Sequence, residues 1–80
     1  MSRDEIFEEL NEIFQDVFDD EDITVSESTT ADEIEDWDSL SHITLISAVE
    51  KKFKMRFKMN EVVNMANVGE MVDIIAERTM

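Results

Sequence analysis

The sequence predicts an all-α protein, a bundle of three longer helices and one short helix with a long loop between the first two longer helices. The 80-residue chain contains no proline and only one glycine, Gly69, so it offers little to tight turns or β-hairpins. Apolar residues recur at three- and four-residue steps in three separate stretches, which is typical of amphipathic helices. Residues 19–38 lose this period and supply the loop. At this length we expect a single small domain, residues 1–80.

The first helix is expected to begin at Ser2 and to end at the acidic run 19–22. Ser2 and Glu5 have the spacing of a capping box, in which each side chain accepts a hydrogen bond from the backbone N–H of the other residue. Three phenylalanines lie in the apolar stripe that follows, and we interpret them as core residues. That stripe consists of Ile6, Phe7, Leu10, Ile13, Phe14, Val17 and Phe18.

The loop is expected to be attached to the bundle through Ile23 and Val25, its two apolar residues before the next polar stretch. Thr30 and Glu33 form a second possible capping box, which predicts a short turn ending near Ile34. A loop of this length inside a small domain is unusual and often functional.

The acidic residues of the loop do not match an EF-hand calcium site. Counting from Asp20, the sixth position is Val25, where the motif needs glycine, and the twelfth is Ala31, where it needs glutamate. We therefore predict no metal site here and interpret the acidic run as solvated, with loose cation binding as the alternative.

The second helix is expected from Ser39 to Lys52 or Phe53. Ser39 stands where the acidic loop ends, so its hydroxyl is suited either to capping the helix or to carrying an anion that the free N–H groups stabilise. The apolar residues expected on one face are Leu40, Ile43, Ile46, Val49 and Phe53. The exposed side is expected to hold Ser41, His42, Thr44, Ser47, Glu50, Lys51 and Lys52.

A short helix and a last longer helix complete the prediction. After the basic linker 54–59, whose Phe57 should enter the core, Asn60 is expected to cap a short helix that runs through Met65. Asn67, with Glu70 three residues later, predicts the start of the last helix. Its buried side is expected to consist of Val68, Met71, Val72, Ile74, Ile75 and Ala76.

The charge balance restricts the classes of partner. Seven basic residues against 21 acidic ones give a net charge of −14. Such a chain disfavours nucleic acid and favours partner proteins with basic docking patches. There is no cysteine, and no apolar run is long enough to insert into a membrane. The first residues do not form a secretory leader, so we expect a cytoplasmic protein.

Asp38-Ser39-Leu40, followed by an amphipathic helix through Glu50 and Phe53, resembles the acyl carrier protein family. The resemblance covers nearly the whole chain and implies a free-standing, monomeric carrier. It implies that a phosphopantetheinyl transferase uses coenzyme A to place a 4′-phosphopantetheine arm on Ser39. The thiol of that arm would carry an acyl group as a thioester between acyl-loading and acyl-transfer enzymes. A carrier of this kind is not itself an enzyme.

The resemblance also implies roles for the residues around Ser39. Asp38 and Leu40 flank the attachment point and would contact the transferase and partner enzymes. Trp37 would either pack under the loop or form part of the docking surface. His42, one turn after Ser39, would contact the phosphate or the cargo, or would simply be a polar surface residue. A catalytic Ser–His pair is not predicted, because the sequence has no glycine-rich turn for an oxyanion site.

Family members can shelter an acyl chain between the second and third helices. The corresponding apolar positions here are Leu45, Val49, Val62 and Met65. These residues are expected in the core in any case, and a pocket is the additional prediction.

Three functions stay open at this point. The polar and basic residues on the exposed side of the second helix differ from the acidic face typical of fatty-acid carriers, which favours a specialised polyketide, lipid or related pathway. An aminoacyl carrier of the same fold is the first alternative. The other is an acidic helical adaptor that is never modified, in which Ser39 serves as a cap.

Overall fold

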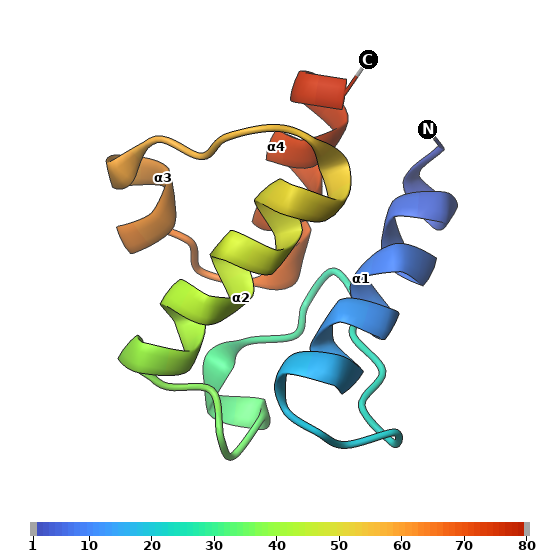
Figure 1. The fold of residues 1–80 in the computed structure, drawn as a ribbon, viewed down its shortest axis with the longest axis vertical. Helices are drawn as coiled ribbons and strands as arrows, with labels where there is room; N and C mark the ends of the chain where they lie inside the picture. The colour runs from blue at the N-terminus through green and yellow to red at the C-terminus, as the bar shows by residue number, and fades with distance from the viewer. Residues whose placement is uncertain (1, 80) are drawn as a thin grey trace.

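The computed structural model describes residues 2–79, in which the expected all-helical architecture is confirmed. These residues form three longer helices, a short helix and one 3₁₀ turn, and none of them is in a strand. The elements in chain order are α1 (Arg3–Val17), the 3₁₀ turn η1 (Ala31–Glu33), α2 (Ser39–Phe53), α3 (Met59–Val63) and α4 (Val68–Thr79) (Figure 1). No helix among the described residues is long and apolar enough to cross a membrane.

Helix α1 begins and ends as its sequence predicts. The Ser2 hydroxyl accepts from the Glu5 N–H at 3.2 Å, and the Glu5 carboxylate accepts from the Ser2 N–H at 3.0 Å. The helix stops at Val17, with Phe18 as its C-cap, and Asp19 takes a left-handed backbone conformation (φ 50°) that cannot continue a right-handed helix.

The hydrophobic core lies among α1, α2 and α4, and α1 packs against both of the others. The largest side chains that are fully removed from solvent are Phe14, Ile6, Leu10, Leu45, Met71, Ile75, Val49, Val68 and Val72. All of these residues except Leu45, which lay outside the predicted face of α2, come from the three apolar stripes, so hydrophobic burial explains why the three helices associate.

One part of the predicted apolar face of α2 is wrong. Ile46, Val49 and Phe53 are buried, but Leu40 is 80% exposed and Ile43 is 62% exposed. The N-terminal half of α2 extends past the start of α4 (Figure 1). Helix α4 therefore does not cover Leu40 and Ile43, which stay exposed.

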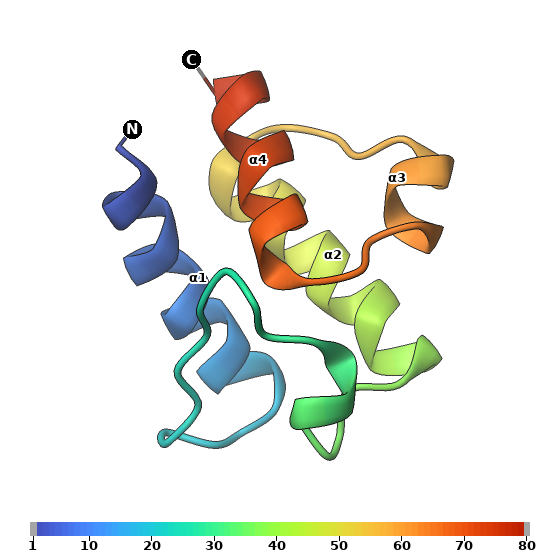
Figure 2. The ribbon, with the colours of Figure 1, turned by 180° about the vertical axis from the view of Figure 1, so that it is seen from behind.

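The long loop is attached to both α1 and α4. Val25 is buried and its N–H donates to the Asn11 side chain at 2.7 Å, as expected for the residue that fixes the loop. Further along, the Glu27 and Thr29 carbonyls accept from the first N–H groups of α4, both at 2.9 Å. Figure 2 shows this loop rising between α1 and the start of α4. The predicted turn after Thr30 is present as η1.

The short helix is displaced from its predicted position. It begins after Lys58 rather than after Asn60, because the Glu61 carboxylate accepts from the Lys58 N–H at 2.7 Å and fixes the first turn there. Met55 of the preceding linker is buried, and Phe57 is half-buried against the core. The start of α4 matches the prediction, since the Glu70 N–H donates to the Asn67 side chain at 2.9 Å.

Candidate functional site

The start of α2 is capped by Asp38, not by Ser39. The Asp38 carboxylate accepts from the Ser41 N–H at 2.9 Å, and the Ser41 hydroxyl accepts from the Asp38 N–H at 2.7 Å. The hydrogen bond from the Ser41 N–H, followed by the interaction with the Ser41 hydroxyl, holds the pKa of the Asp38 carboxyl below its usual value. Asp38 is therefore charged near neutral pH, and a charged cap suits the positive end of a helix.

Ser39 consequently keeps a free hydroxyl. It is the first helical residue and is exposed, and within residues 2–79 its hydroxyl makes no hydrogen bond. The interpretation of Ser39 as a cap is wrong, because its neighbour Asp38 already occupies that position. An exposed, unbonded hydroxyl at a helix start is accessible to a modifying enzyme.

An apolar pocket opens beside Ser39, between α2 and α3. Its volume is about 550 Å³. The residues that line it are Ala31, Trp37, Asp38, Ser39, His42, Ile43, Met59, Val62, Val63 and Met65. The predicted residues Val62 and Met65 are among them. Leu45 and Val49 are not, because both point into the core and are fully buried.

Trp37 lies under the loop rather than on an open docking surface. Its side chain is only 9% exposed and meets the Phe14 ring edge-on, with ring centroids 5.2 Å apart. The indole Nε1–H donates to His42 Nδ1 at 3.0 Å. A buried indole N–H needs such an acceptor, so His42 completes the packing of Trp37.

His42 is held on both ring nitrogens. Nδ1 accepts from Trp37, and Nε2 lies 3.1 Å from the Val62 carbonyl oxygen of α3. A contact of this ring with a phosphate, as its position in the sequence suggested, requires one of these two bonds to break. The ring instead joins the loop, α2 and α3.

Comparison with known proteins decides the family. A family model described as the phosphopantetheine attachment site matches residues 8–75. An acyl carrier protein from Acidothermus cellulolyticus is 38% identical over 82 aligned residues, which cover 100% of this chain and 95% of that one. The chain belongs to the acyl carrier protein family.

A solved structure supports the same assignment. The solution structure of the holo acyl carrier protein from Geobacter metallireducens superimposes with a TM-score of 0.85 at 38% sequence identity. The match covers 90% of this chain and 83% of that one. Members of this family are carriers, and the matches indicate a covalently attached 4′-phosphopantetheine.

The residues at the start of α2 fit this group. The arm needs a hydroxyl oxygen that is exposed and not committed to the fold, and Ser39 has one. When bound, the arm supplies a terminal thiol that forms thioesters. The side chains along the adjacent pocket are mostly apolar, which suits the hydrocarbon part of a cargo.

Four residues that were not predicted as site residues line this pocket: Ala31, Ile43 of α2, and Met59 and Val63 of α3. Met59 and Val63 are 78% and 70% exposed, and with Leu40 and Ile43 they are the large apolar side chains of the described residues that face solvent. Of these exposed side chains, all but Leu40 line the pocket beside Ser39. The sequence signal for Met59 was its alternation with Met55 and Phe57 in the basic linker. This alternation indicated that apolar side chains of the linker enter the core, but it did not indicate that Met59 lines a pocket.

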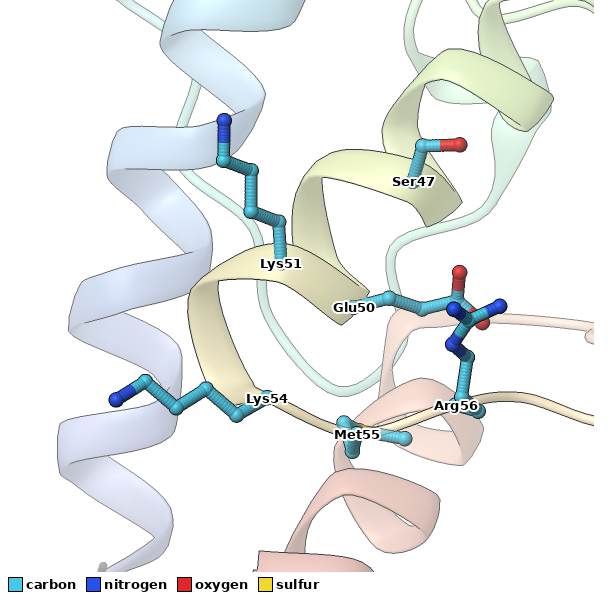
Figure 3. A pocket seen from close by; sticks show the side chains of 6 residues that line it. All are labelled: Ser47, Glu50, Lys51, Lys54, Met55 and Arg56. Carbon is cyan, nitrogen blue, oxygen red and sulfur yellow. The ribbon is translucent and has the colours of Figure 1, made fainter.

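The opposite end of α2 carries positive charge. A second depression there is lined by Ser47, Glu50, Lys51, Lys54, Met55 and Arg56 (Figure 3). Glu50 is tied to the fold, since its carboxylate accepts from the Phe57 N–H at 2.8 Å. Figure 3 shows Lys51 and Lys54 extending in a different direction from Glu50. No cluster of three or more metal-binding side chains occurs in the part of the chain that the structure describes.

Proposed function

We propose that this protein carries acyl groups as thioesters on a 4′-phosphopantetheine arm attached to the Ser39 hydroxyl. The observation that carries the proposal is that Ser39 lies in an Asp-Ser-Leu sequence at the first position of a 15-residue helix, with its hydroxyl exposed and unbonded. A separate transferase would join Ser39 Oγ to the pantetheine phosphate of coenzyme A. The hydroxyl proton leaves to a base of the transferase, and the adenosine bisphosphate half departs.

The arm works as a tether. A flexible arm raises the effective concentration of the cargo at each partner active site, so no new contact is needed for every partner. The family's role for Asp38 and Leu40 in partner contact is consistent with their exposure on either side of Ser39. Trp37 contributes indirectly by supporting the loop from below.

The pocket between α2 and α3 would shelter the acyl chain. Val62 and Met65 keep the role that the resemblance implied, and Ile43, Met59 and Val63 take the place of Leu45 and Val49. Two methionines on a rim of this kind favour an adaptable site, because the unbranched thioether side chain fits cargo of different shapes.

The pathway we propose is a specialised polyketide, lipid or related one. The exposed side of α2 carries Ser41, Thr44 and Ser47 and ends in Lys51. This face lacks the row of carboxylates on which the basic patches of fatty-acid enzymes dock. Acidic residues concentrate instead in the preceding loop, 32–38, and this segment is the proposed contact for the basic patch of the transferase. The protein is proposed to act as a monomer.

The two alternative functions, an unmodified adaptor and an aminoacyl carrier, are less well supported. The unmodified adaptor required Ser39 as the helix cap, and Asp38 has that role. An aminoacyl cargo uses the same arm and the same hydroxyl, and no residue of the pocket favours it over an acyl chain.

Incubation with coenzyme A, Mg²⁺ and a broad-specificity phosphopantetheinyl transferase tests the proposal. We expect the intact mass of the wild type to increase by one phosphopantetheine. Ser41→Ala should gain the same mass and Ser39→Ala should gain none. An equal gain in Ser39→Ala would refute the assignment of Ser39.

A further inference from the structure

Helix α3 is poorly supported by packing. It has five residues, none of which is fully buried: Val62 packs partly against the core, and Met59 and Val63 are mostly exposed. A helix of this length is not stable alone in water. Its position therefore depends on the few side chains that attach it to the rest of the bundle.

Two polar attachments hold α3. On one side Arg78 of α4 donates two hydrogen bonds to the Glu61 carboxylate, at 2.8 and 2.7 Å. On the other side His42 of α2 contacts the Val62 carbonyl oxygen at 3.1 Å. The Glu61–Arg78 attachment joins α3 to α4. The contact of His42 with Val62 joins α3 to α2, and both of these residues line the pocket beside Ser39.

The two hydrogen-bonding partners of His42 determine which ring nitrogen carries the proton. A carbonyl only accepts and an indole N–H only donates, so the Val62 oxygen must face Nε2–H and the Trp37 indole must face an unprotonated Nδ1. The neutral Nε2–H tautomer satisfies both partners. The Val62 carbonyl lies in the last turn of α3, where helix carbonyls lack intrahelical partners, so this bond also completes the helix end.

The Trp37 ring connects this arrangement to the core. It packs against Phe14 of α1 edge-on at 5.2 Å and stacks on the His42 ring at 5.9 Å, with an interplanar angle of 27°. Phe14 is fully buried. His42 is thus fixed by a rigid neighbour on one side and bonded to a weakly supported helix on the other.

We propose that His42 is a positioning residue: its neutral Nε2–H tautomer, set by Trp37, holds α3 on α2 and determines how far the pocket beside Ser39 opens. The consequence for cargo rests on the proposed acyl pocket, whereas the attachment of α3 does not. The tests therefore use the unmodified protein, so that failure of the carrier assignment and failure of this proposal are distinguishable.

The first test compares amide hydrogen exchange in His42→Phe, His42→Gln and the surface control Ser47→Ala. Phenylalanine keeps the ring and removes both hydrogen bonds, whereas glutamine retains a donor and an acceptor. We expect the amides of α3 to exchange about fivefold faster in His42→Phe, with α1 and α4 unchanged, because α3 loses the hydrogen bond between His42 and the Val62 carbonyl oxygen. His42→Gln should restore part of the protection, and Ser47→Ala should match the wild type.

Two further measurements complete the test. Nitrogen chemical shifts of the wild-type ring should show the proton on Nε2, a result that does not depend on any variant folding. N-phenyl-1-naphthylamine, a neutral apolar dye, should bind more strongly to His42→Phe than to the wild type. A proton on Nδ1, unchanged exchange of α3, or an equal increase of exchange in all helices would each overturn the proposal.

Discussion

Asp38 and Ser39 are neighbours with different roles: Asp38 caps α2, and Ser39 is the proposed attachment residue. The Asp38 carboxylate holds the first turn of α2 through Ser41, and the Ser39 hydroxyl is left without a structural partner. A sequence alone does not separate these tasks, because aspartate and serine are both preferred helix caps and stand side by side here. The geometry of the cap decides which residue is free.

Exchange of each residue for alanine separates the two tasks. Asp38→Ala should lower the Tm by about 5 °C, since a lost cap in a domain of this size has an effect of that order. Ser39→Ala should leave the Tm within about 2 °C, because the hydroxyl has no partner to lose. Thermal unfolding followed by circular dichroism at pH 7 measures both. A larger loss in Ser39→Ala than in Asp38→Ala would return the capping role to Ser39.

Single residues also decide how the loop meets α4. A Cβ atom at Gly69 would lie 2.7 Å from the Glu27 carbonyl oxygen, closer than carbon and oxygen approach in proteins. Gly69→Ala should therefore destabilise the protein by about 1–3 kcal/mol, although the same exchange in an open helix interior is stabilising by up to about 1 kcal/mol. Urea denaturation gives the difference, with Ser47→Ala in α2 as the control. A stabilised Gly69→Ala would show that the loop does not approach α4 so closely.

Among the elements, α1, α2 and α4 were predicted close to their observed positions, whereas α3 was predicted as a short helix but with the wrong start. The three longer helices have apolar stripes over several turns, and their caps lie within a few residues of their starts. The first turn of α3 depends on Glu61, which is bound by Arg78 from 17 residues further along the chain. The exposure of Leu40 and Ile43 was missed for a related reason, because a helical stripe does not tell which part of it a neighbouring helix covers.

The Glu61–Arg78 pair, which joins α3 to α4, predicts that the stability of the protein depends on pH. Hydrogen bonds from Arg78, and then from the Lys58 N–H, lower the pKa of Glu61 from 4.5 to about 2. A carboxyl whose pKa is lowered on folding stabilises the protein above its unfolded pKa, and this stabilisation is lost as the pH falls towards the folded pKa. The wild type should thus be more stable than Glu61→Gln above about pH 4.5, and the advantage should shrink between pH 4.5 and pH 2.

Thermal midpoints of both proteins between pH 2 and pH 7 give this difference directly. Other carboxyl groups titrate in the same range, but they are common to both proteins and cancel in the comparison. A difference that stays constant down to pH 2 would mean that the pair does not lower the pKa of Glu61.

For the molecule as a whole, charge is unevenly distributed. The net charge is −14, yet five of the seven basic residues lie between 51 and 58, in the last turn of α2 and the linker that leads to α3. The site beside Ser39 therefore combines an apolar pocket with an acidic loop, and the far end of α2 is positive. The motif and the charge could be found in the sequence. The contact between His42 and the Val62 carbonyl oxygen could not, because Val62 lies 20 residues away.

Self-repulsion of the acidic residues should make stability depend on salt. We expect the Tm to rise by about 5 °C between 10 mM and 200 mM NaCl, because screening shortens the range of repulsion between exposed carboxylates. Calorimetry at pH 7 measures the shift. A melting temperature that does not change over this range would show that repulsion does not limit the stability of the fold.

Fragmentation mass spectrometry of the protein after transferase treatment shows directly which residue carries the phosphopantetheine. We expect the group on residue 39 in every modified molecule, in the wild type and in Ser41→Ala alike. A folded protein that carries the group on Ser41, on Ser47 or on no residue, with a transferase shown to be active on another carrier, would contradict it.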